Sequence, residues 1–232
     1  MNPRERIEER EYDVLSPRAF HVKEAKRAHA EAKDPLRTDF ARDRDRILHS
    51  NSFRRMKHKT QVYIAPQGDH YRTRMTHTLE VAQIGRTMAR ALSLNEDLVE
   101  AIALGHDLGH TPFGHVGEQA LKEIYGHFEH NEQSVRIAER LERDGAGLNL
   151  TLPVLDGMLN HCGPLKAHTL EGSLIKYADR IAYLCHDYED AESMGLITAT
   201  DMPEEIRRRI GTTHSSMITA MVTDVVEHSM QD

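Results

Sequence analysis

The chain contains the stretch GHDLGHTPFGHVGE at residues 105–118, with three histidines, two carboxylates and four glycines. His106 and Asp107 stand side by side at the end of an apolar helix pattern. Histidine and aspartate are seldom buried without partners, and both are metal ligands. The stretch therefore predicts that His106 and Asp107 hold a divalent metal ion. The remaining histidines and Glu118 are then expected to line a pocket beside it.

The composition describes a globular protein of one large domain or one and a half. Of 232 residues, 39% are hydrophobic, which is enough for a core. No apolar run approaches the roughly 18 residues of a membrane span, and the charged N-terminus does not resemble a signal peptide. Two cysteines are too few for a disulfide framework and suggest a reducing compartment. We therefore expect a cytoplasmic protein with no membrane partner.

Cys162 follows His161 directly, without a second cysteine in a Cys-x-x-Cys pattern. The simpler interpretation is a small buried residue, and the alternative is a thiolate ligand. The net charge of −7 argues against a generic nucleic-acid binder. The sixteen histidines suit both metal ligation and proton transfer near neutral pH.

Alanine, leucine, glutamate and arginine dominate the chain, which favours an all-α fold. We expect an N-terminal arm over residues 1–40, loosely packed with short helices, and one domain over 41–232. Helices are predicted over 74–92, from Asn95 to a stop at Gly109, over 115–125, 131–143, 153–160, 169–194 and 201–210, and from 213 to about 230. A short β-hairpin is the most that residues 61–71 suggest. The predicted apolar stripe of the helix over 74–92 is Met75, Leu79, Ala82, Met88 and Leu92.

A basic segment follows the arm. Its apolar residues recur at helical intervals: Phe40, Ile47, Leu48, Phe53 and Met56. Its cations are Arg42, Arg44, Arg46, Arg54, Arg55, Lys57 and Lys59. One interpretation is a solvated face that Asp43 and Asp45 partly offset. The other is that some of these cations meet a phosphate-rich ligand.

Three segments together offer a set of metal donors: His77, His106 with Asp107, and Asp179. Two imidazoles and two carboxylates suit Mn, Fe, Co, Ni or Zn, and Mg less naturally. Taken alone, His77 is more typical of a hydrogen-bonded core histidine than of a metal ligand. Asp179, Tyr183 and Asp187 are four residues apart and share one helix face.

This H…HD…D pattern resembles that of the HD-domain metal-dependent phosphohydrolases. The local sequence is more specific. RDRILHS at 44–50, FRRM at 53–56, KTQV at 59–62, DHYRTRMTHTLEV at 69–81, LGHDLGHTPFGH at 104–115, FEHNEQS at 128–134 and YADRIAY at 177–183 resemble the deoxynucleoside triphosphate triphosphohydrolases, or dGTPases. The resemblance runs from about residue 3 to the end.

The resemblance implies an HD-domain helical bundle that hydrolyses a dNTP to the deoxynucleoside and inorganic triphosphate. It implies metal ligation by His77, His106, Asp107 and Asp179, and a catalytic role for His115, Glu118 and His110. It implies substrate contacts from Gln61, Arg74, His130, Asn131, Arg180, Tyr183 and Asp187, with Gln61, Tyr183 and Asp187 on the sugar side. The metal, whether Mn, Mg, Fe, Ni, Co or Zn, stays open.

The resemblance also implies a homo-oligomer. The basic segment is then a candidate for a subunit interface, or for an effector site that takes a nucleotide or a single-stranded nucleic acid. Members of this family usually continue into more helices, so we expect a C-terminal part that is incomplete. Two alternatives stay open. One is an HD phosphohydrolase for a monophosphate, an alarmone or a cyclic dinucleotide, and the other is an inactive nucleotide-binding regulatory module.

Overall fold

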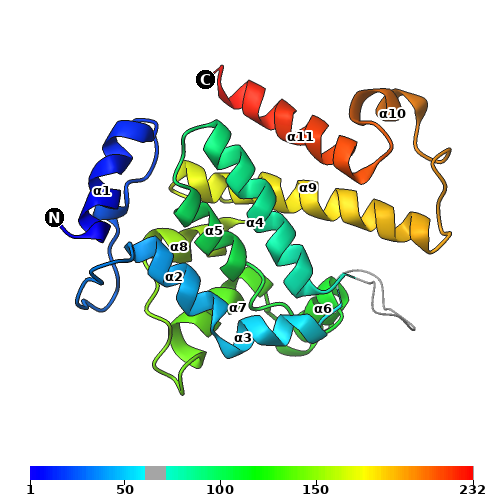
Figure 1. Cartoon of the computed structure of the whole chain (residues 1–232). Helices are drawn as coiled ribbons and strands as arrows, with labels where there is room; N and C mark the ends of the chain where they lie inside the picture. The colour runs from blue at the N-terminus through cyan, green and yellow to red at the C-terminus, as the bar shows by residue number, and fades with distance from the viewer. Residues whose placement is uncertain (61–71, 232) are drawn as a thin grey trace.

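The computed structural model describes residues 1–60 and 72–231, and these residues form eleven α-helices and no β-sheet (Figure 1). The helices are α1 (Pro3–Val14), α2 (Asp39–Leu48), α3 (Asn51–Arg55), α4 (Arg74–Ala91), α5 (Glu96–Gly105), α6 (Gly114–Tyr125), α7 (His130–Arg136), α8 (Leu152–Asn160), α9 (Leu170–Ser193), α10 (Glu204–Ile210) and α11 (His214–Ser229). The all-α prediction is confirmed. The suggested hairpin at 61–71 lies outside the described residues. None of the helices in the described ranges is long and apolar enough to cross a membrane.

The centre of the fold is formed by α4, α5 and α9, which pack against one another (Figure 1). Helix α5 is buried along Leu98, Val99 and residues 101–105, so it is apolar nearly all round, as expected of a central helix. A Cβ on Gly85 of α4 would lie 2.9 Å from Val99 Cγ1, so the glycine allows α4 and α5 to approach closely. Helices α2 and α8 cover α5, and α11 packs on α9.

The loop after α5 is fastened to α7 through the backbone. A Cβ on Gly109 would lie 2.3 Å from both His130 O and Ser134 N, so only glycine fits. The Gly109 amide donates to Ser134 Oγ at 2.8 Å, and that hydroxyl donates to His106 O at 2.7 Å. This contact fixes where the chain leaves α5 and therefore where His106 and Asp107 point.

The N-terminal residues contact the central helices through buried polar groups. Helix α1 begins with a capping box at Asn2. Glu11 of α1 accepts from Val22 N at 2.7 Å and from Asn95 Nδ2 at 3.0 Å, and Asn95 is the N-cap of α5. Glu171 of α9 accepts from the backbone of Phe20 and of Asn95. The division of the chain at residue 40 stays a prediction.

Several local predictions are wrong in detail. The helix expected over 131–143 stops at Arg136 and continues as a π-helical turn, Ile137–Leu141. The helix expected from 201 begins at Glu204, because Pro203 is its N-cap. Leu79 and Leu48 are 48% and 39% exposed, because α4 and α2 turn other residues toward the core. Those on α4 include Val81, Ile84 and Ala89.

The arginines of α2 are paired within the protein. Arg42 and Arg46 contact Glu31, and Arg46 Nη1 also donates to the carbonyls of Leu148 and Asn149. Arg44 contacts Glu100 at 3.3 Å. These contacts engage the α2 cations within the protein, so they support neither the solvated-face interpretation nor the phosphate-binding one for these arginines.

Candidate active site

The four predicted metal donors come together at the junction of α4, α5 and α9. His77 Nε2 lies 3.0 Å from Asp179 Oδ1 and 3.9 Å from Asp107 Oδ2. His106 Nε2 lies 3.4 Å from Asp107 Oδ1 and 3.9 Å from Asp179 Oδ1. Donor atoms about 2.1 Å from a shared ion lie about 3.0–3.4 Å apart at adjacent positions and about 4.2 Å apart at opposite ones. The distances of 3.0 and 3.4 Å match adjacent donors, and the two of 3.9 Å fall between these limits.

The hydrogen bonds of His106 leave one nitrogen free for a metal. Its Nδ1 lies 2.6 Å from Ala103 O and must donate to that carbonyl. Its Nε2 therefore carries a lone pair, and this buried atom has no hydrogen-bond partner among the described residues. A buried lone pair without a partner is costly in a folded protein and is satisfied by a cation. The residues present thus fit a divalent metal.

A chain of hydrogen bonds orients the second imidazole. His186 Nδ1 lies 3.0 Å from Asp187 Oδ1 and donates to it. His186 Nε2 therefore accepts from His77 Nδ1 at 2.9 Å, which leaves the His77 Nε2 lone pair toward Asp107 and Asp179. His186 is fully buried. Sequence reasoning gave His186 no role, because the partner that defines its role is 109 residues away.

A second group of histidines lies beside the metal donors. His115 Nδ1 is 3.0 Å from Glu118 Oε2, one turn apart on α6. Glu118 Oε1 accepts from the backbone amide of His130 at 2.7 Å and lies 3.0 Å from His130 Nδ1. The rings of His110 and His130 stack with centroids 4.0 Å apart. One carboxylate therefore holds two of the three histidines in place.

The surroundings keep the carboxylates ionised. Burial would raise the pKa of Asp107, but His106, His110 and Arg74 outweigh it and hold that pKa well below its usual value. Burial likewise opposes the effect of His77 on Asp179, and the pKa of Asp179 is still lowered. Both groups are therefore charged near neutral pH, as metal ligation requires.

The surroundings shift the pKa values of the histidines in opposite directions. Burial lowers the pKa of His110 to about 2 and, together with His106, that of His161 to about 4. Burial would also lower the pKa of His130, but hydrogen bonds with Cys162 and Glu118 raise it to about 10. Burial would lower the pKa of His77 as well, but Asp179 and Asp107 raise it. When no metal is bound, the site thus pairs neutral imidazoles at His110 and His161 with histidines that favour the charged form.

A cavity of about 440 Å³ joins the two groups. It is lined by Arg74, His77, Asp107, His110, His115, His130, His161, Cys162, Gly163, Lys176, Asp179, Arg180, Tyr183 and Asp187. Lys176, Asp179, Arg180, Tyr183 and Asp187 come from one face of α9, as the spacing predicts. A larger cavity of about 620 Å³ lies between α1, α4, α9 and α11, but its lining contains no histidine and no carboxylate.

Not every predicted residue reaches this cavity. His106 is buried and absent from the lining. Glu118 lies behind His115 and His130 and is also absent. Asn131 is also absent, and its amide donates to Leu159 O at 2.6 Å. Gln61 lies outside the described residues.

Two lysines in or beside this cavity had no predicted site role. Lys59, counted only in the basic segment, donates to His110 O at 2.6 Å. Lys176, on the cavity wall, donates to Gly163 O at 2.5 Å. Lys59 lies on the KTQV segment, and Lys176 lies on the same face of α9 as Asp179. These two positions could have identified both lysines from the sequence.

Comparison with known proteins agrees with this geometry. Residues 74–184 match the HD domain, which places the chain among proteins with a metal-dependent phosphohydrolase domain. The chain is 56% identical to a deoxyguanosinetriphosphate triphosphohydrolase-like protein of Caldanaerobacter subterraneus subsp. tengcongensis, over 99% of this chain and 68% of that protein. It is 52% identical to the protein of the same name from Desulfatibacillum aliphaticivorans, over 100% of this chain and 70% of the relative. The protein of that name from Clostridium tetani is 48% identical, over 100% of this chain and 69% of that protein.

The chain therefore belongs to the family of deoxyguanosinetriphosphate triphosphohydrolase-like proteins.

Proposed function

We propose that this protein hydrolyses a deoxynucleoside triphosphate to the deoxynucleoside and inorganic triphosphate, with a bound divalent metal. The observation that carries the proposal is the cavity whose wall contains three of the four metal donors (His77, Asp107 and Asp179), together with His115 and cations from α4 and α9. The names of the relatives support a nucleotide substrate. A site with this composition suits a ligand that carries several negative charges next to a sugar.

Cations on the wall suit a triphosphate. Arg74 is 4% exposed, and its Nη1 donates to Asp107 Oδ2 at 2.9 Å, while its Nε is buried without a partner. Arg180 and Lys176 line the same cavity from α9. A metal held by His77, His106, Asp107 and Asp179 would supply further charge neutralisation at the reacting phosphate. Together these groups would stabilise the charge that develops when the phosphorus is attacked.

We assign the proton transfer to His115. Its Nδ1 donates to Glu118, which leaves Nε2 to exchange a proton with a ligand in the cavity. Attack of water on the α-phosphorus breaks its bond to the 5′-oxygen. The water oxygen stays on the triphosphate, and the 5′-oxygen takes up a proton. Glu118 acts through His115 and His130 by holding them.

The sugar end of the substrate is assigned to Tyr183 and Asp187, which line the cavity on α9. Tyr183 under the deoxyribose and Asp187 at the 3′-hydroxyl would crowd the 2′-position. Tyr183→Ala should then reduce the preference for a dNTP over the matching rNTP by about tenfold in kcat/KM, the scale of one lost packing contact. An unchanged ratio would remove Tyr183 from this role.

The test of the reaction is product analysis. The protein is incubated with each dNTP in Mn²⁺ or Mg²⁺, and the products are separated by chromatography. Inorganic triphosphate and deoxynucleoside support the proposal. Orthophosphate, pyrophosphate or turnover of a different nucleotide would instead identify another HD phosphohydrolase. Nucleotide-dependent stabilisation of the fold with no turnover in any metal would identify a regulatory module.

A further inference from the structure

A second group of potential metal ligands lies on the cavity wall beside the four HD-domain donors, and one member, His161, also lies within 4.8 Å of the ligand atoms of His106 and Asp179. His130 begins α7, His161 follows the last residue of α8, and Cys162 is next to it. His130 Nε2 lies 3.2 Å from His161 Nε2 and 3.7 Å from Cys162 Sγ. The three donor atoms all lie within 4.8 Å of one another.

The outer nitrogens of both rings are already committed. His130 Nδ1 lies 3.0 Å from Glu118 Oε1, and His161 Nδ1 lies 2.7 Å from Met158 O, so each Nδ1 donates a hydrogen bond. Both rings therefore turn Nε2 toward each other. Two neutral imidazoles in this arrangement would oppose their lone pairs at 3.2 Å, so the gap holds either the Nε2 proton of a His130 imidazolium or a metal ion.

The spacing of the donors matches a thiophilic metal. Tetrahedral Zn²⁺, with bonds of about 2.05 Å to nitrogen and about 2.3 Å to sulfur, separates two nitrogens by about 3.3 Å and nitrogen from sulfur by about 3.6 Å. The separations here are 3.2 Å and 3.7 Å. We propose that His130, His161 and Cys162 form a second metal site, distinct from the HD-domain site, for Zn²⁺ or a similar thiophilic ion.

The surroundings have the other features of such a site. His161 and His130 are 1% and 6% exposed, and their Nδ1 atoms donate to a backbone carbonyl and a carboxylate, the usual outer partners of metal-bound histidines. Cys162 is half-buried and lines the cavity, so an ion can reach this site through the cavity. Binding would release the thiol proton and the proton between the two rings to solvent. The expectation that Cys162 is a small buried residue is wrong, because the side chain is half-buried. The alternative, a thiolate metal ligand, is supported by the two neighbouring histidines, His130 and His161.

Sulfur makes the site distinguishable, because the four HD-domain donors include none. Co²⁺ is added to the metal-free protein, bound metal is counted, and the near-ultraviolet absorption of thiolate-to-Co²⁺ charge transfer is followed. We expect two Co²⁺ per chain and a charge-transfer band that saturates with one of them. Excess Zn²⁺ should abolish that band.

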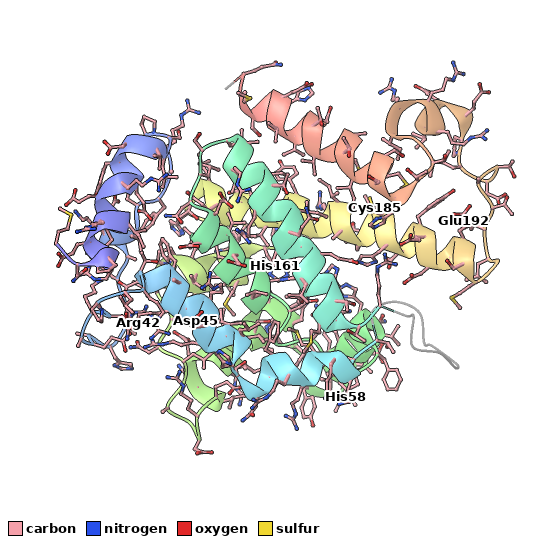
Figure 2. The ribbon with its side chains drawn as sticks, in the orientation of Figure 1. Arg42, Asp45, His58, His161, Cys185 and Glu192 are labelled. Atoms are coloured by element: carbon pink, nitrogen blue, oxygen red, sulfur yellow. The ribbon has the colours of Figure 1, made fainter. Side chains whose placement is uncertain are left out.

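Two variants and one control complete the test. Cys162→Ser should bind one Co²⁺ per chain and lose the charge-transfer band. His161→Asn should weaken Co²⁺ binding at this site at least tenfold, so that one tightly bound Co²⁺ per chain remains. Cys185→Ser is the matched control, since Cys185 is a second cysteine, lies on α9 and does not line the cavity. Figure 2 labels it on α9, away from His161 near the centre of the view. Cys185→Ser should keep both Co²⁺ ions and the charge-transfer band.

One Co²⁺ per wild-type chain without a charge-transfer band, or a band that survives in Cys162→Ser, would overturn the proposal. The gap between the two imidazole rings would then hold a proton and no metal ion.

Discussion

The two sides of the cavity are built differently. The metal side takes its donors from α4, the end of α5, and α9, helices that pack against one another at the centre of the fold. The histidine side takes His115 and Glu118 from α6, which makes no extensive contact with another described helix and exposes Val116, Ile124 and Tyr125. The core therefore fixes the metal donors, whereas His115 depends on a few local contacts.

Glu118 is the main contact that holds the histidine side. It is 8% exposed although its helix is largely exposed, and it meets His115 Nδ1 and both the amide and Nδ1 of His130. Its pKa is lowered, because the hydrogen bonds from His115 and His130 outweigh burial. The difference between the two sides predicts that each can be disabled separately.

The largest effect is expected on the metal side. Asp107→Ala removes a metal donor and leaves Arg74 buried without its partner. Bound metal should fall to background and turnover should drop by more than about 1,000-fold, since a metal supplies several kcal/mol of charge stabilisation. Metal analysis and steady-state rates measure both quantities. Asp156→Ala, on α8 outside the cavity, is the control and should retain metal and activity.

The next effect is expected on the histidine side. Glu118→Gln removes the charge that holds His115 and His130, so kcat should fall by about 100-fold, within the range of a lost proton-transfer group. The metal content should stay at the wild-type level. Glu123→Gln, exposed on the same helix, should change neither quantity. Loss of metal together with activity in Glu118→Gln would show that the two sides are one unit.

A smaller effect is expected at His186, which orients His77. His186→Leu removes the acceptor for His77 Nδ1, and metal affinity should weaken by about 10–100-fold, as for other outer partners of metal ligands. Glutamine can both accept and donate, so His186→Gln should recover part of that affinity. Isothermal titration with Mn²⁺ measures it. Equal affinities for the leucine variant and the wild type would exclude the positioning role.

The smallest effect concerns stability and pH in the metal-free protein. The pKa of His161 is lowered to about 4, so between about pH 6.5 and pH 4 the unfolded chain takes up a proton that the folded protein does not. His161 should therefore contribute a fall in folding stability of about 3 kcal/mol at most as the pH drops through this range. His110, with its pKa lowered to about 2, adds a loss of the same sign. His130, with its pKa raised to about 10, is protonated in both states there and adds no slope.

Thermal unfolding of the metal-free protein in chelator at several pH values tests this expectation. His161→Asn should flatten the acid limb, while His168→Asn, at an exposed histidine, should leave it unchanged. An identical slope in wild type and His161→Asn would mean that other buried groups, such as His110, set the acid sensitivity.

The sequence predicted the helices of the core and the metal side well, for a physical reason. His77, His106-Asp107 and Asp179 each lie on or next to a helix whose apolar residues are buried, so placing the helices also places the donors. Helix periodicity alone did not show that these helices meet; the resemblance to a known family supplied that step.

Predictions that depended on distant partners were weaker. Nothing near His161-Cys162 in the sequence indicates that His130, 31 residues earlier, lies 3.2 Å from His161. The same holds for His186 and its partner on α4. Leu79 was assigned to the buried stripe because periodicity alone gives the spacing of a face, whereas the packing of α5 and α9 decides which face is covered.

The close approach at Gly109 has a consequence for how this family can vary in length. Backbone contact between Gly109 and residues 130–134 closes the segment 110–129 into a loop with fixed ends. Residues could be inserted or removed near the exposed Gly126 without moving either His110 or His130. One residue added at 109 or at 134 would shift both sides of the cavity against each other. Chain-length differences among active relatives should therefore collect between α6 and α7 and be absent at the two ends of this loop.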